Sequence, residues 1–225
     1  HLLMNWGPCL ILGDDVLPSS EPASAYDKER STYDESVEYV CNEFSMAAQV
    51  LPTSTQQSIS YYQRPTKGAA LALIARLRLY HASPLFNGGD AARRSFGTWK
   101  RKSDGAYYVN QSYDAKRWAV AAAAAKAVID MGLYDLHTVE ADPRNPYPLA
   151  DNVPTDNYPN GAGGIDPYYS FSHMFNGEGI LQTNKEFIWA MESDNVYNYT
   201  RHSFPVYFGG WGGMSVPQRV VDAFL

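Results

Sequence analysis

The residues best suited to ligand chemistry are aromatic side chains placed among glycines. The segment FPVYFGGWGGMSVP sets Tyr207, Phe208 and Trp211 among four glycines. Glycine permits positive φ angles and close backbone approach, while exposed Trp and Tyr rings stack on amphipathic ligands such as the C–H face of a sugar ring. The residues that we predict to stack on or hydrogen bond to a ligand are Trp211, Tyr207, Trp99, Tyr197, Tyr199 and Asn87.

Each of these aromatic rings, taken alone, fits a packing role as well as a binding role, because proteins bury large aromatic surfaces in their cores. Their concentration in loop-like segments favours a ligand surface, since loops held by a rigid frame are the usual place for binding residues. The sequence as a whole supports this emphasis, with 17 Tyr and 5 Trp in 225 residues.

The histidines and glycines form no catalytic pattern. The 5 His include no HxxxH or HExxH pair, which a helical zinc site would require. No G-x-S-x-G nucleophile elbow is present. The segments GAGGID and FGGWGG lack the Lys and Ser/Thr of a phosphate-binding loop. We therefore expect a protein that is not an enzyme, although a glycosidase stays an alternative because it needs only two well-placed carboxylates.

Metal ligands are equally hard to assemble. Cys9 and Cys41 match no zinc spacing, and the sequence leaves open whether they form a disulfide. Four aspartates lie in one irregular stretch where oxygen atoms could converge on calcium, but the D-x-D-x-D-G loop is missing. We interpret these aspartates as solvated turn residues and expect neither a metal nor a cofactor. They are Asp142, Asp151, Asp156 and Asp166.

Charge and hydropathy exclude two classes of partner. The net charge of −6 and the lack of a Lys/Arg stripe argue against nucleic-acid binding. No apolar run reaches the 18 residues of a candidate membrane-spanning helix, because Arg76 and Arg78 interrupt the best stretch.

Three segments carry helical periodicity with recognisable ends. The first begins with a capping box at Thr32-Tyr33-Asp34-Glu35 and ends before Pro52. The second has Thr66 as its N-cap and ends at Pro84, and the third runs over about 114–131 and ends at Gly132. Glycine at that position is typical of a left-handed helix cap.

The second segment, RPTKGAALALIARLRLYHASPLFNGG, is lined with Gly and Ala and has almost no polar face. Small residues let helix axes approach closely, so we expect other helices to cover this helix nearly all round. Helix pairs that pack in this way form tetratricopeptide-like arrays, and an ordinary alanine-rich bundle is the alternative. The following region, about 136–186, is irregular and rich in Pro, Gly, Asn and Tyr, and a short strand is predicted over Glu186–Met191.

Six segments in order resemble the SusD/RagB-like nutrient-binding proteins of the Bacteroidetes outer membrane. Besides the Gly/Ala-lined segment, they are HLLMNWGPCLIL, STYDESVEYVCNEFSMAAQVLP, RWAVAAAAAKAVIDMGLYDL, NKEFIWAMESDN and GGMSVPQRVVDAF. The resemblance implies a mainly α fold, a tetratricopeptide-like scaffold with long irregular loops and minor β structure. Residues 1–225 would form a single domain segment of a longer chain, with helical repeats over about 32–132 and an irregular ligand-side region over about 136–216.

The resemblance also implies a function. Such proteins are lipid-anchored at the outer face of the outer membrane, where they capture oligosaccharide and deliver it to a SusC-like TonB-dependent transporter. The anchoring cysteine is expected outside this segment, because Cys9 follows Trp6-Gly7-Pro8, which is no lipobox. A peptide ligand and a pure protein-interaction scaffold for the transporter are the alternatives. Binding residues vary widely in this family, so none is transferred to this chain.

Overall fold

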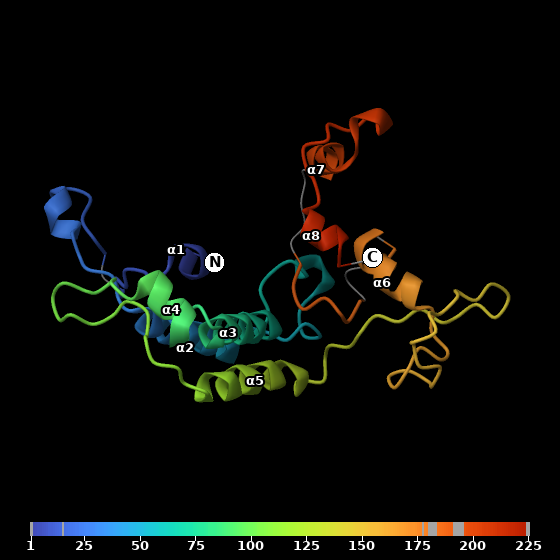
Figure 1. Cartoon of the computed structure of the whole chain (residues 1–225), viewed down its shortest axis with the longest axis horizontal. Helices are drawn as coiled ribbons and strands as arrows, with labels where there is room; N and C mark the ends of the chain where they lie inside the picture. Colours follow the sequence, from blue (N-terminus) through green and yellow to red (C-terminus); the bar gives the residue numbers. More distant parts are fainter. Residues whose placement is uncertain (1, 15, 177, 180–183, 191–195, 224–225) are drawn as a thin grey trace. The chain divides into compact units, whose positions relative to one another are not determined.

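The computed structural model of the chain describes residues 2–14, 16–176, 178–179, 184–190 and 196–223 (Figure 1). The chain divides into two compact units, His1–Ala190 and Met191–Leu225. The helices of the first unit are α1 (Leu2–Trp6), α2 (Tyr33–Val50), α3 (Lys67–Ala82), α4 (Gly89–Phe96), α5 (Lys116–Ile129) and α6 (Pro167–Asn176), with short 3-10 helices η1 (Ala23–Tyr26) and η2 (Ile59–Tyr61). The second unit has α7 (Val196–Ser203), η3 (Val206–Phe208) and α8 (Gln218–Val221).

The prediction of a mainly α fold is confirmed. Within the described ranges, β structure is limited to isolated bridges, which pair Lys100 with Tyr107, Glu140 with Ile165, and Asn157 with Gly163. None of the helices in these ranges is both long and apolar enough to span a membrane.

The three predicted helices are present, and their ends follow local chemistry. At the start of α2, the Thr32 hydroxyl accepts from the Glu35 amide at 3.2 Å, and the Glu35 carboxylate accepts from the Thr32 amide at 2.7 Å. This reciprocal pair is the predicted capping box. Thr66 caps α3 by accepting from the amide of Ala69, and Gly132, beyond the end of α5, has a φ of 63°.

Helix α3 packs against α2 and α5, and Figure 1 shows α5 running beside it. The reason for glycine at position 68 is Tyr134, which follows α5. A Cβ atom at Gly68 would lie 1.8 Å from the Tyr134 hydroxyl oxygen. Only glycine therefore allows the Tyr134 ring to lie directly on the first turn of α3.

The expectation that α3 is covered nearly all round is wrong. Arg76, Leu79 and Tyr80 are exposed on this helix, and Leu79 keeps 54 % of its accessible surface. Packing against α2 and α5 buries Gly68, Ala69 and Leu77 but leaves another face of α3 exposed to solvent. A Gly/Ala-rich composition permits close helix approach, but it does not by itself supply neighbours on every side.

The hydrophobic core lies where α1, α2, α3 and α4 meet. Its central contact is a parallel stack of the Tyr33 and Phe86 rings, with centroids 4.2 Å apart. The buried residues of this cluster are Leu3, Tyr33, Val37, Cys41, Leu77, Phe86, Ala92 and Val109. Cys41 belongs to this core and Cys9 is half-buried, and both thiols are free.

The predicted strand over Glu186–Met191 is not found in residues 186–190, and Met191 lies outside the described residues. The segment instead begins with a turn, in which the Asn184 side chain accepts from the Glu186 amide at 2.9 Å. A strand needs a partner strand for its backbone groups, whereas here the Phe187 amide donates within the turn to the Asn184 carbonyl at 3.3 Å. A side chain makes the long-range contact: the Trp189 indole nitrogen donates to the Gln63 carbonyl at 2.7 Å.

The irregular region contains one helix that the sequence pattern did not reveal. Helix α6 begins after Asp166, whose carboxylate accepts from the Tyr169 amide at 2.9 Å. Asp166 keeps only 4 % of its surface exposed. The interpretation of Asp166 as a solvated turn residue is therefore wrong, because it is a buried helix cap.

Candidate functional site

The second unit gathers aromatic side chains around Trp211. The Tyr197 ring on α7 meets the Trp211 ring edge to face, with centroids 6.3 Å apart. The His202 ring, at the other end of α7, meets it at 4.9 Å and 78°. Tyr197, Arg201, His202 and Trp211 together form what we call the Trp211 platform.

Arg201 joins the parts of the platform. Its guanidinium lies 5.2 Å from the Tyr197 ring centroid, and its Nε donates to the Tyr197 hydroxyl at 3.1 Å. A second guanidinium nitrogen donates to the Gly209 carbonyl. The backbone carbonyl of Arg201 accepts from the Trp211 amide at 2.6 Å. Arg201 thus ties helix α7 to the glycine-rich loop through both its side chain and its backbone.

The four glycines around Trp211 have two separate reasons. Gly209 and Gly212 adopt φ angles of 78° and 59°, which residues with a Cβ rarely reach. Gly210 and Gly213 provide close approach to α7 and its end: added Cβ atoms would lie 2.0 Å from the Phe204 carbonyl oxygen and 2.1 Å from the His202 ring. Both roles were predicted from the sequence for this segment.

The platform presents rings to the outside of its unit. Trp211 keeps 50 % of its surface exposed and Tyr197 keeps 62 %. Tyr207 is 91 % exposed and touches Phe208 edge to face at 5.4 Å. Tyr199 is exposed on the same helix as Tyr197. An exposed indole bordered by arginine and histidine combines an apolar stacking face with hydrogen-bond donors.

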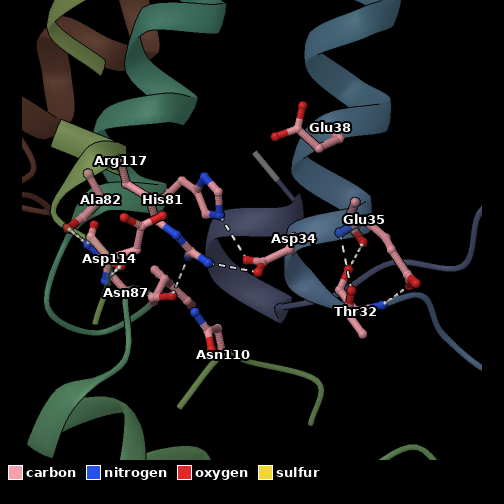
Figure 2. A network of polar contacts seen from close by, with 12 residues as sticks. Thr32, Asp34, Glu35, Glu38, His81, Ala82, Asn87, Asn110, Asp114 and Arg117 are labelled. Atoms are coloured by element: carbon pink, nitrogen blue, oxygen red, sulfur yellow. Dashed lines mark hydrogen bonds and ion pairs between the residues drawn. The ribbon is translucent and has the colours of Figure 1, made fainter. Parts of the chain in front are cut away.

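Asn87 serves the scaffold in the first unit. Its side chain is fully buried, donates to the carbonyls of Ala82 and Asp114 at 3.2 and 2.9 Å, and accepts from the Asp114 amide at 3.0 Å. These bonds tie the end of α3 to the segment that precedes α5 (Figure 2). Because its polar atoms already have partners inside the protein, the Asn87 side chain is not available to a ligand.

Trp99 also packs within the first unit. Its ring lies 4.8 Å from Tyr108 and 6.2 Å from Phe96, and it is half-buried. It continues the aromatic series that starts at the Tyr33–Phe86 stack. Packing against these rings accounts for Trp99.

A polar network fixes the three packed helices of the first unit. Figure 2 shows His81 of α3 and Arg117 of α5 both reaching Asp34 of α2. The His81 ring nitrogen lies 2.8 Å and the Arg117 guanidinium 2.7 Å from the Asp34 carboxylate. Burial opposes ionisation of Asp34, but the hydrogen bonds and charges of His81 and Arg117 outweigh it and lower the pKa of the Asp34 carboxyl. Arg117 also donates to the Phe86 carbonyl at 3.1 Å. The network is structural, because each of its groups already has a partner within the protein.

Sequence reasoning missed a pocket in the first unit. It has a volume of about 320 Å³ and is lined by parts of the loop between α2 and α3, by Leu133 and Tyr134, and by residues 184–185 and 187–190. Tyr62, Phe187 and Trp189 contribute aromatic rings to its lining. The consecutive tyrosines in SISYYQRP were a signal in the sequence, but pairing them with Trp189, 127 positions beyond Tyr62 (189 − 62), requires the fold.

Comparison with known proteins gives a family and a fold. Residues 1–79 match the model of a SusD-like family described as starch-binding associating with outer membrane. BT4246, a Bacteroides SusD-like protein, is similar in structure with a TM-score of 0.60 at 24 % identity, over 90 % of this chain. Selenomethionine BT4246 is similar with a TM-score of 0.54 at 24 % identity, over 90 % of this chain and 33 % of that chain. No curated protein matches.

These similarities confirm the resemblance that the sequence motifs carried. The chain spans about a third of the length of BT4246, at 34 %. At this identity the structural similarity establishes the fold, and over residues 1–79 the chain is similar to a family whose description joins starch binding to the outer membrane.

Proposed function

Starting from a chain that is SusD-like over residues 1–79 and in its fold, we propose that it captures oligosaccharide through the Trp211 platform. The observation that carries this proposal is the half-exposed indole of Trp211, which is in edge-to-face contact with the Tyr197 and His202 rings. A sugar ring has an apolar C–H face and a polar rim, so it matches an indole face bordered by hydrogen-bond donors.

The proposed function is binding without catalysis. Glycoside hydrolysis needs two carboxyl groups on either side of the bond to be cleaved, and the platform consists of aromatic, arginine and histidine side chains. Its arginine is already engaged with Tyr197 and Gly209, which suits it to fixing a surface in place. We propose that Tyr207 and Tyr199 extend this surface for a longer ligand.

Capture at the cell surface followed by delivery to a TonB-dependent transporter of the SusC type is the biological role that we propose. The family description, which joins starch binding to the outer membrane, supports this role. In this proposal the full-length protein is lipid-anchored at the outer membrane. The alternative is that its ligand is a peptide and not an oligosaccharide.

Calorimetric titration tests the binding proposal. A panel of soluble starch fragments, xylan, mannan and β-glucan oligosaccharides, with peptides as the competing class, identifies the ligand. Trp211→Ala is expected to weaken binding of the best oligosaccharide by roughly 1–3 kcal/mol, the loss typical of a central aromatic anchor. Phe175→Ala, which removes an exposed ring of α6 in the first unit, is the control and should bind as the unmodified protein does.

Three results would count against the proposal. Unchanged affinity of Trp211→Ala, with the fold intact by circular dichroism, removes the platform from the binding site. Binding of peptides in place of every oligosaccharide replaces the ligand class. Release of reducing sugar from the bound oligosaccharide by the purified protein makes it a glycosidase.

A further inference from the structure

The pocket lined by the loop between α2 and α3, by Leu133 and Tyr134, and by residues of the 184–190 segment has walls that are fixed by contacts between residues far apart in the sequence. The Trp189 indole nitrogen donates to the Gln63 carbonyl at 2.7 Å, which ties residues 184–190 to the loop after α2. The Lys185 carbonyl accepts from the Asp135 amide at 3.3 Å, which ties them to the segment after α5. Tyr134 rests on Gly68 of α3. The cavity is therefore part of the folded frame of the first unit.

The lining of this pocket has the chemistry of a carbohydrate site. Tyr62, Phe187 and Trp189 supply rings, and the indole N–H of Trp189 is already used within the protein. Hydroxyl groups of Ser54 and Thr55 stand in the same lining. A lining that holds both rings and hydroxyl groups suits a ligand that is apolar on its faces and polar around its rim.

The charged groups of the pocket lining narrow the class of ligand further. Lys185 is the charged residue among the described lining residues, and it makes no ion pair with any residue that the structure describes. The described lining has no Asp or Glu, so the two carboxyl groups that glycoside cleavage needs are not supplied by it. An ammonium group with free hydrogen-bonding capacity donates to hydroxyl or carboxylate oxygens of a bound sugar.

The volume sets the size of the ligand. At about 320 Å³, the pocket lies at the lower end of the roughly 300–1,000 Å³ range of small-molecule sites. It has room for one sugar ring and little more, whereas the Trp211 platform is an exposed surface of the second unit.

From these observations we propose that the pocket is a second carbohydrate site, which binds a single pyranose ring such as the end of an oligosaccharide chain. The inference rests on the proposed function, because both take carbohydrate as the ligand class, but it uses different residues in a different unit. Tyr62 and Trp189 provide the stacking faces, and Lys185 donates hydrogen bonds to the rim of the ring.

Filling the pocket tests this inference without removing a wall. Thr55→Trp places an indole at the lining, and Ser60→Trp is the matched control, because Ser60 is an exposed residue of the same loop that does not line the pocket. The titrants are methyl glycosides of glucose, galactose, mannose and glucuronic acid, together with the oligosaccharide panel. A second variant, Trp189→Ala, removes one ring directly.

We expect at least one methyl glycoside to bind the unmodified protein, Ser60→Trp and Trp211→Ala alike, and to lose tenfold or more in affinity for Thr55→Trp and Trp189→Ala. Methyl glycoside affinity that is the same in Thr55→Trp as in Ser60→Trp, or that is not measurable in the unmodified protein, overturns the inference. If Trp211→Ala then still loses oligosaccharide binding, the proposed function stands alone. If no carbohydrate binds any form of the protein, the proposed function and the inference fall together.

Discussion

Asp34 links the three packed helices of the first unit. It is one of two acids in the first turn of α2 and contacts α3 through His81 and α5 through Arg117. Removing a partner of a buried polar group leaves the others unsatisfied, which costs more than the lost bond itself contributes. Because the Asp34 side chain keeps 41 % of its surface exposed, solvent screens part of this effect.

Asp34→Asn is expected to lower the free energy of unfolding by roughly 1–2 kcal/mol near neutral pH, since charge-assisted hydrogen bonds become neutral ones. The folded-state pKa of Asp34 lies below its ordinary value. Its contribution is therefore present above the unfolded pKa of about 3.9 and is lost as the pH falls through the lower folded value. Urea unfolding of both proteins from pH 7 down to pH ~2 should show their difference shrinking in acid. A difference that stays constant with pH would assign the loss to shape and not to charge.

At the scale of elements, the sequence predicted those features that depend on neighbours along the chain. The capping box at Thr32 and Glu35 and the left-handed Gly132 are local, so their residue types suffice. The segment 186–190 has the composition of a strand, but its structure depends on Gln63 and Asn184, which are selected only in the fold. For the same reason the pairing of Tyr62 with Trp189 in one pocket is visible only in the fold.

The contact of Gly68 with Tyr134 shows how one small residue positions two elements. Gly68→Ala is expected to destabilise the protein by roughly 1–3 kcal/mol, because the added methyl group overpacks the site. Tyr134→Phe alone should be neutral or slightly stabilising, since the Tyr134 hydroxyl is buried and has no hydrogen-bond partner among the described residues.

Combining the two changes makes the test specific. Tyr134→Phe should recover part of the loss in the Gly68→Ala background, because the hydroxyl is the atom nearest to the added methyl group. Lys67→Ala, an exposed change in the same helical turn, is the control and should have little effect. Urea unfolding of the unmodified protein, the two single variants and the double variant measures this coupling. Strictly additive changes in the free energy of unfolding would show that the two residues do not meet as described.

At the scale of the whole molecule, the chain has a helical frame in its first unit and an aromatic-lined surface in each of its two units. The first unit contains the network around Asp34 and the Tyr62–Trp189 pocket, and the second contains the Trp211 platform. Of the residues predicted from the sequence, Trp211, Tyr207, Tyr197 and Tyr199 lie exposed in the second unit, whereas Asn87 and Trp99 belong to the packing of the first. Composition identifies rings that are fit for binding, but it does not distinguish a packed ring from an exposed one.

The binding of carbohydrate to Trp211 can be observed directly, because the chain has 5 Trp, at positions 6, 99, 118, 189 and 211. Each contributes one indole N–H signal to a ¹⁵N-correlated NMR spectrum, and single Trp→Phe variants assign them. On titration with the oligosaccharide selected by calorimetry, we expect the Trp211 signal to shift, and the Trp189 signal to shift as well if the pocket binds a sugar ring. The signals of Trp6, Trp99 and Trp118 should not change. A Trp211 signal that does not move at saturating oligosaccharide would contradict the proposed binding of carbohydrate to the Trp211 platform.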